Sequence, residues 1–128
     1  MTGVQTCALP ILKELLAKHF TTKPDGIPGN DDTGTMSAWA IFSMMGLYPD
    51  CPGVPEYTLT TPTFDEVTIK LDPEYWGKDK LVIKKEGHGD YIKEIRLGNK
   101  KINKYLISHD DLIKAGEITF VVTDHINK

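Results

Sequence analysis

The stretch DGIPGNDDTGTMSAWAIFSMMG, residues 25–46, joins a polar loop to a segment with the composition of a helix. A helix is predicted from about Gly34 to Met45, with Gly46 as its C-terminal stop and Pro49 three residues beyond. Its apolar side chains point in every direction around the axis: Met36, Ala38, Trp39, Ala40, Ile41, Phe42, Met44 and Met45. A helix that is apolar on all faces must be buried on all sides. We therefore expect this helix to need packing partners that the chain itself does not supply.

The last turns of a second, amphipathic helix are predicted before the loop. Leu12, Leu15, Leu16 and Phe20 recur at helical spacing, with Lys and Glu between them. The turn-forming residues of 25–29 then separate the two helices.

After residue 57 the pattern changes to that of strands. The predicted strands are 67–71, 81–83, 91–97 and 117–122. Gly98 and Asn99 supply a hairpin turn, and Ser108 with Asp111 resembles a capping box that opens a short helical turn. Together these features predict an α+β fold, with two helices followed by a small antiparallel β unit.

The first residues do not have the composition of a domain start. Residues 2–11, TGVQTCALPI, resemble the conceptual translation of a common short-read sequencing adapter. Such segments are excluded from fold reasoning, as expression tags are. The alternative is an ordinary chain terminus. We therefore divide the chain into a non-native segment 1–11, a helical region 12–52 and a β-rich region 53–128. We expect residues 1–11 to contribute nothing to stability, and the native protein to extend upstream of residue 12.

Length and charge limit the classes of partner. The chain has 128 residues, enough for one domain, and a net charge of -3. A nucleic-acid-binding domain would normally be strongly basic, so nucleic acid is not expected as a partner. In the locally basic stretch 78–104, acidic residues alternate with lysines, which favours a solvated sheet face over a phosphate groove. No apolar run reaches the ~20 residues that span a bilayer, so no membrane span is expected.

The densest group of candidate catalytic residues, Asp31 and Asp32, lies just before the apolar helix. Neighbouring side chains diverge at a helix start, so one carboxylate can cap backbone N–H groups while the other faces a cleft. The helix dipole favours the ionised form of both, and a general base that takes a proton from water must be ionised. Two alternatives remain open. The pair could only shape the turn, or it could belong to a calcium loop, although the EF-hand spacing is absent.

Histidines and aromatic residues offer weaker candidates. His88 and His109 are expected in exposed loops, since nothing in the sequence places them together. Tyr75 and Trp76 could stack on a sugar face, but we expect them to cover the sheet. Trp39 is expected in the core.

Residues 22–39, TKPDGIPGNDDTGTMSAW, are similar to the motif near the end of the catalytic domain of glycoside hydrolase family 92. The likeness continues in GLYP, CPG, EY and PTF, which lie between residues 46 and 64, and in ISHDDLIKAG at 107–116. The resemblance implies an (α/α)6 barrel paired with β-sandwich structure. The two helices would then be the last two of the barrel.

The resemblance also implies a function. Enzymes of this family are calcium-dependent, inverting exo-α-mannosidases that release mannose from glycans such as N-glycans and yeast mannan. They are mostly secreted or periplasmic proteins of bacteria. Their general-base carboxylates correspond to Asp31 and Asp32, of which we favour Asp32, and Gly29 and Asn30 become candidates for substrate binding. The calcium ligands are not assigned.

In an inverting glycosidase the base lies about 6.5–9.5 Å from the acid, which leaves room for the attacking water. The family's general acid is a glutamate upstream of the matched region. The chain alone is therefore expected to be inactive, with the missing upstream part of its own chain as its partner.

Two departures and two other function classes remain. Thr35 stands where the family usually has Gln, and Thr33 where Cys or another small residue is common, which leaves the fine specificity open. The alternatives are a non-catalytic carbohydrate-binding β module and an inactive structural fragment. The all-round apolar helix argues against the first, since an independent module would not expose that surface.

Overall fold

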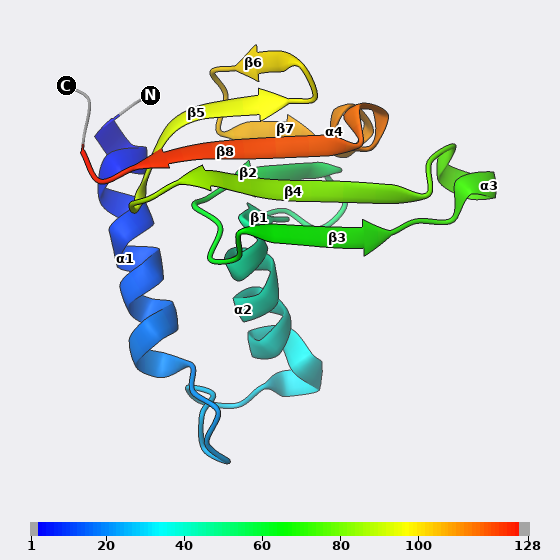
Figure 1. The fold of residues 1–128 in the computed structure, drawn as a ribbon. Helices are drawn as coiled ribbons and strands as arrows, with labels where there is room; N and C mark the ends of the chain where they lie inside the picture. The colour runs from blue at the N-terminus through cyan, green and yellow to red at the C-terminus, as the bar shows by residue number, and fades with distance from the viewer. Residues whose placement is uncertain (1–2, 126–128) are drawn as a thin grey trace.

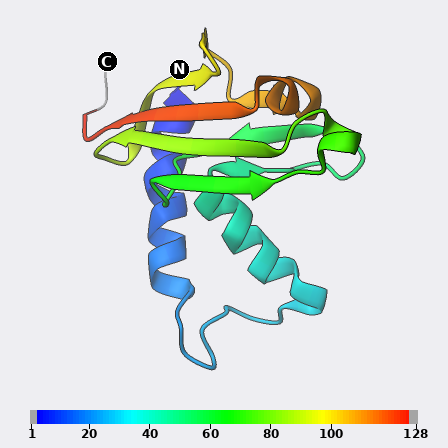
Figure 2. The same ribbon diagram turned by 45° about the vertical axis from the view of Figure 1, so that its right-hand side comes forward.

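The computed structural model describes residues 3–125. Two longer helices, α1 (Gly3–His19) and α2 (Thr35–Met45), project from the same side of the β region (Figures 1 and 2). A 3-10 turn, η1 (Asp32–Gly34), leads into α2. The described helices also include two short ones, α3 (Pro73–Trp76) and α4 (His109–Ala115).

The strands form two sheets. A three-stranded sheet has the order β1-β2-β7, and a five-stranded sheet has the order β3-β4-β8-β5-β6. The strands are β1 (Leu47–Tyr48), β2 (Glu56–Leu59), β3 (Glu66–Lys70), β4 (Lys80–Gly87), β5 (Tyr91–Leu97), β6 (Lys100–Ile102), β7 (Leu106–Ser108) and β8 (Glu117–Thr123). The four predicted strands are thus confirmed as β3, β4, β5 and β8, and the α+β class is confirmed.

The prediction of a purely antiparallel β unit was wrong. Strand β8 pairs antiparallel with β5 but parallel with β4, from Val82 opposite Glu117 to Gly87 opposite Val122. A parallel pair needs a crossover connection, and here β5, β6, β7 and α4 together form it. Hairpin turns in the sequence predict the pairing of strands that follow one another in the chain. The last strand, β8, lies between β4 and β5, and this position depends on tertiary packing.

The core is centred on β8. Its Ile118 and Phe120 side chains are fully buried, because the strand lies between β4 and β5. The surrounding core cluster includes Leu59 and Ile107 of the smaller sheet, so it joins the two sheets. Burying each large apolar side chain contributes roughly 1.5–3 kcal/mol.

Helix α1 begins at Gly3 and continues through Pro10 to His19, so the helical pattern that starts at Leu12 falls in its last turns, as predicted. Leu9 is only 5% exposed and belongs to the core cluster. The burial of Leu9 runs against the expectation that residues 1–11 contribute nothing to stability or function, which remains to be measured. Residues 1 and 2 lie outside the described part of the chain. The adapter origin of this segment and the region boundaries at residues 12 and 53 remain predictions.

Helix α2 ends as predicted at Gly46, which has φ 86° and donates its N–H to the carbonyls of Phe42 and Ser43. A Cβ there would lie 2.8 Å from the Pro62 ring, so only glycine fits. The buried residues of α2 are Ala40 and Ser43, while Ile41 is 53% exposed. The expectation that the described residues leave this apolar helix incompletely covered is confirmed. Membership of an (α/α)6 barrel remains a prediction.

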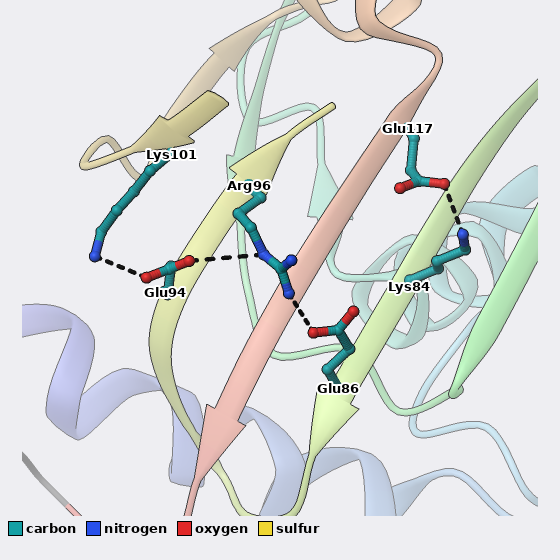
Figure 3. A network of polar contacts seen from close by, with 6 residues as sticks. All are labelled: Lys84, Glu86, Glu94, Arg96, Lys101 and Glu117. Atoms are coloured by element: carbon teal, nitrogen blue, oxygen red, sulfur yellow. Dashed lines mark hydrogen bonds and ion pairs between the residues drawn. The ribbon is translucent and has the colours of Figure 1, made fainter. Parts of the chain in front are cut away.

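Charged residues on the five-stranded sheet pair with one another rather than forming a basic groove (Figure 3). Glu94 lies 2.7 Å from Lys101 and 3.6 Å from Arg96, which also contacts Glu86. The Lys101 hydrogen bond lowers the pKa of Glu94, and a 2.7 Å bond to Glu117 raises the pKa of Lys84. The predicted solvated sheet face is confirmed. Among residues 3–125, no helix has the length and apolar character needed to cross a membrane.

Candidate active site

The loop between α1 and α2 carries the predicted site residues, and its first part is closed by backbone hydrogen bonds. The Thr21 N–H donates to the Gly26 carbonyl at 2.8 Å, and the Gly26 N–H donates to the Lys23 carbonyl at 2.9 Å. A Cβ on Gly26 would lie 2.1 Å from the Thr21 carbonyl oxygen, so this close approach requires glycine. The segment from Gly29 to Asp32 therefore extends from a closed turn.

Asp31 acts as an anchor for the start of α2. One carboxylate oxygen accepts the backbone N–H of Ser37 at 2.7 Å, and the other accepts the Ser37 hydroxyl at 2.7 Å. Ser37 is the third residue of α2, so Asp31 satisfies an N–H that lacks a partner within the helix. The Ser37 hydroxyl, followed by the Ser37 N–H, lowers the pKa of Asp31. Asp31 is therefore ionised and held in one orientation.

Asp32 has a different environment. Its side chain is exposed, and no hydrogen bond from the described residues reaches its carboxylate. Its backbone carbonyl accepts the Thr35 hydroxyl at 2.8 Å, which holds the turn. Asp32 and Thr33 have φ values of 28° and 60°, a left-handed conformation that is uncommon for residues other than glycine. Backbone strain of this kind clusters at functional sites.

The two predicted substrate-binding residues lie beside Asp32 on the same exposed loop. Gly29 has φ 75° and open space around the position a Cβ would occupy. Asn30 is exposed. The structure thus brings together Gly29, Asn30 and Asp32 at the surface, while Asp31 is held by α2.

An open apolar groove lies between α1 and α2 and includes residues from both sides of this loop. The groove has a volume of about 380 Å³ and is lined by Leu15, His19, Phe20, Pro28, Met36 and Trp39. Trp39 stacks on Phe20 with ring centroids 5.4 Å apart. The Trp39 ring is half-buried within the described part of the chain. A core position for Trp39 in the longer protein remains a prediction.

The described residues do not assemble a complete calcium site. No group of three or more His, Cys, Asp or Glu among residues 3–125 could hold a metal ion. Calcium takes 6–8 oxygen ligands, and both oxygens of Asp31 already accept hydrogen bonds from Ser37. Calcium dependence therefore stays a prediction from the resemblance.

Outside this loop, the structure brings together an aromatic cluster that the sequence analysis missed. The Nδ1 atom of His109 lies 2.9 Å from the Tyr57 hydroxyl, and the His109 ring meets Trp76 edge-on at 5.0 Å. The expectation of an exposed loop residue was thus wrong for His109 and confirmed for His88. These contacts depend on the pairing of β2 with β7, for which local sequence carries no signal.

Comparison with known proteins identifies the class. Residues 1–124 match the model of the glycosyl hydrolase family 92 catalytic domain. An uncharacterized secreted glycosidase of Arthroderma benhamiae is 31% identical over 107 residues, which cover 80% of this chain and 14% of that protein. The chain therefore belongs to glycosyl hydrolase family 92.

Solved structures have the same fold. A family 92 inverting mannosidase from Bacteroides thetaiotaomicron VPI-5482 superposes with a TM-score of 0.78 and 32% identity, covering 91% of this chain and 16% of its own. A family 92 α-mannosidase from Bacteroides thetaiotaomicron, solved with mannoimidazole, superposes with a TM-score of 0.80 and 24% identity, covering 93% of this chain and 16% of its own. The chain thus spans about one sixth of these mannosidases.

Proposed function

We propose that this chain forms the C-terminal part of a secreted or periplasmic inverting exo-α-mannosidase that releases mannose from glycans of the N-glycan or mannan type. Family membership and the likeness to an inverting mannosidase support this reaction class. The observation that carries the site assignment is the difference between the two neighbouring aspartates. Asp31 is engaged through both carboxylate oxygens, whereas the carboxylate of Asp32 is exposed.

In the proposed mechanism Asp32 is the general base. Its carboxylate accepts a proton from a water molecule while that water attacks the anomeric carbon of mannose from the face opposite the leaving group. Asp31 is a positioning residue, because its bonds to Ser37 hold the start of α2 and the strained turn that presents Asp32. Gly29 and Asn30 lie next to this carboxylate on the exposed loop and are proposed to contact the sugar.

The remaining parts of the proposed site come from a longer chain. The general acid must protonate the leaving oxygen from about 6.5–9.5 Å across the sugar, and we assign it to a segment upstream of the helices. A calcium site would likewise need oxygen ligands beyond those that the described residues bring together. In the whole enzyme, a calcium ion would bind oxygen atoms of the sugar, because it is a hard cation that prefers oxygen ligands.

The test compares two conservative variants in the longer protein. Asp32→Asn should lower kcat for an α-mannoside by about 10²–10⁴-fold with little change in thermal stability, because it removes the group that takes the proton. Asp31→Asn should lower thermal stability, because it weakens the anchor on Ser37. Ser37→Ala is the matched control, since it removes one Asp31 bond and leaves both carboxylates in place.

The stereochemistry of the product provides a second measurement. NMR at early times should show β-mannose released from an α-mannoside, as inversion requires. Near-normal kcat in Asp32→Asn would reject Asp32 as the base. If the longer protein binds mannosides but does not cleave them, the carbohydrate-binding module is supported instead. If it neither binds nor cleaves them, the chain has a structural role.

A further inference from the structure

Two aromatic side chains stand exposed at the end of the five-stranded sheet. Tyr75 is 76% exposed and Trp76 is 37% exposed, in the α3 turn between β3 and β4. Their rings meet edge-on with centroids 4.7 Å apart. The expectation that this pair covers the sheet was therefore wrong for Tyr75.

The turn that carries the two rings is well ordered by its hydrogen bonds. The Asp72 carboxylate accepts the Glu74 N–H at 2.9 Å, which caps the turn, and the Trp76 N–H donates to the Asp72 carbonyl at 2.8 Å. Gly77 ends the turn with φ 67°. At the base, the Leu71 N–H donates to the Asp79 carbonyl at 2.8 Å. These hydrogen bonds fix the backbone of the turn that carries both aromatic rings.

Trp76 also contacts His109 on α4, which is linked in turn to Tyr57 in the smaller sheet. Its ring contacts the ring of His109 at the start of α4, and the Nδ1 atom of His109 lies within hydrogen-bonding distance of the Tyr57 hydroxyl on β2. This chain of contacts supports one edge of the aromatic pair while Tyr75 remains free. A braced Trp beside an exposed Tyr is a rigid apolar surface that no described residue covers.

We propose that Tyr75 and Trp76 form a second carbohydrate-binding site, separate from the Asp32 loop, that takes a pyranose ring of a mannose-containing glycan. This ligand class rests on the proposed function. The C–H face of a pyranose is apolar and matches an aromatic ring, whereas its hydroxyls need polar neighbours. Glu74 lies in the same turn as the two rings, and Asp110 follows His109 in the sequence. Both are exposed, and their carboxylates can accept hydrogen bonds from those hydroxyls.

The proposed site and the Asp32 loop lie at different ends of the molecule. In Figures 1 and 2, α3 lies at the end of the long strands, whereas η1 lies at the far end of α2. One sugar ring cannot occupy both places, so the α3 site would bind another part of a long or branched glycan. A second contact of this kind raises the effective concentration of chain ends at the first site.

Fluorescence provides a direct test because the sequence has two tryptophans. In the full chain carrying Trp39→Phe, Trp76 is the one remaining tryptophan. Phe keeps an aromatic ring at the position that stacks on Phe20. Titration with yeast mannan should change the Trp76 emission in a saturable way, and dextran of similar size should be the comparison polymer. Adding Tyr75→Ala should weaken mannan binding about tenfold, equivalent to ~1.4 kcal/mol.

A matched control uses another exposed tyrosine. Tyr105 is 49% exposed, so Tyr105→Ala removes a comparable ring elsewhere and should leave mannan binding unchanged. Far-UV circular dichroism of each variant verifies folding; Tyr75 is sufficiently exposed that its removal should not unfold the chain. An absent emission change, or equal affinities in Tyr75→Ala and Tyr105→Ala, would overturn the proposal.

Two further outcomes distinguish the proposed sugar site from a protein-contact surface and from the proposed catalytic function. If Tyr75→Ala abolishes concentration-dependent self-association in sedimentation while mannan has no effect, the surface serves a protein contact and the sugar site is rejected. Hydrolysis is an independent readout: in the longer protein, Tyr75→Ala should leave the kcat for a small aryl mannoside unchanged. If the longer protein with Tyr75 in place binds mannan at Trp76 but hydrolyses no α-mannoside, the proposed function is rejected and the α3 site stands.

Discussion

Asp31 and Asp32 are neighbours in the sequence with contrasting surroundings in the structure. Ser37 engages both carboxylate oxygens of Asp31 through its N–H and hydroxyl, and the described residues leave the carboxylate of Asp32 exposed. The positive φ at Asp32 and Thr33 interrupts regular helix geometry between the two environments. One carboxylate is thus used to begin a helix, and the other is available for chemistry.

A prediction at this scale concerns the titration of Asp31. Its pKa is lowered below the ordinary value of 3.8, chiefly by the Ser37 hydroxyl. Ionised Asp31 therefore stabilises the fold above that value, and the contribution is lost as pH falls through the lowered pKa. Ser37→Ala should raise the pKa of Asp31, measured by carboxyl NMR, and should move the loss of stability to higher pH.

The control for this titration is Thr35→Ala. It removes a hydroxyl that donates to the Asp32 carbonyl and leaves the Asp31 carboxylate untouched. The pKa of Asp31 should stay at its wild-type value in that variant. An identical pKa of Asp31 in wild type and Ser37→Ala would show that the Ser37 hydroxyl does not hold this carboxylate.

At the scale of single elements, α1 has one buried face and one exposed apolar face. Leu9 and Leu16 are buried, whereas Leu15 on the same helix is 42% exposed and lines the apolar groove. The helix therefore uses one face to close the core of the β region and leaves another open. Leu9, in the first half of α1, belongs to the packed structure despite the unusual sequence around it.

The matched substitutions Leu9→Ala and Leu15→Ala test this division. Leu9→Ala should lower the free energy of unfolding by about 2–5 kcal/mol, because it removes a buried side chain and leaves a cavity. Leu15→Ala changes helix propensity equally and should cost much less. Urea denaturation measures both. Equal effects would mean that the start of α1 is not packed in solution, as expected for residues of foreign origin.

At the scale of the whole molecule, apolar side chains are buried in the β region but remain exposed on the two long helices. The β region encloses a core in which Ile118 and Phe120 are completely buried. The two long helices instead present the groove around Trp39 and the exposed Ile41. Large exposed apolar surfaces mark sites of interaction. The proposed longer protein would supply the cover, since the chain spans about one sixth of the solved relatives.

This uncovered face predicts the behaviour of the chain alone. The full chain should bind an environment-sensitive dye, and Ile41→Lys should lower dye fluorescence and self-association because it places a charge on that face. Val54→Lys, at a residue 46% exposed in the loop between β1 and β2, is the control and should have little effect. Dye titration and sedimentation provide the measurements. A monomer that binds no dye would contradict the prediction.

Local sequence determined the elements of this protein. The end of α2 at Gly46, the hairpin turn after β5, the Ser108 cap of α4 and the alternating strands all follow from φ preferences, capping and periodicity. These properties depend on residues within a few positions of each other. The motif from residue 22 to 39 likewise indicated the family, which the comparison of the whole chain confirmed.

Tertiary structure alone decided the rest. The parallel pairing of β8 with β4, the burial of Leu9, and the contact of Trp76 with His109 join residues far apart in the chain. The different surroundings of Asp31 and Asp32 likewise depend on backbone geometry at Asp32 and Thr33 that residue types do not specify. Which strand inserts where, and which side chain is covered, is chosen by the total packing of the core, and no local pattern encodes that choice.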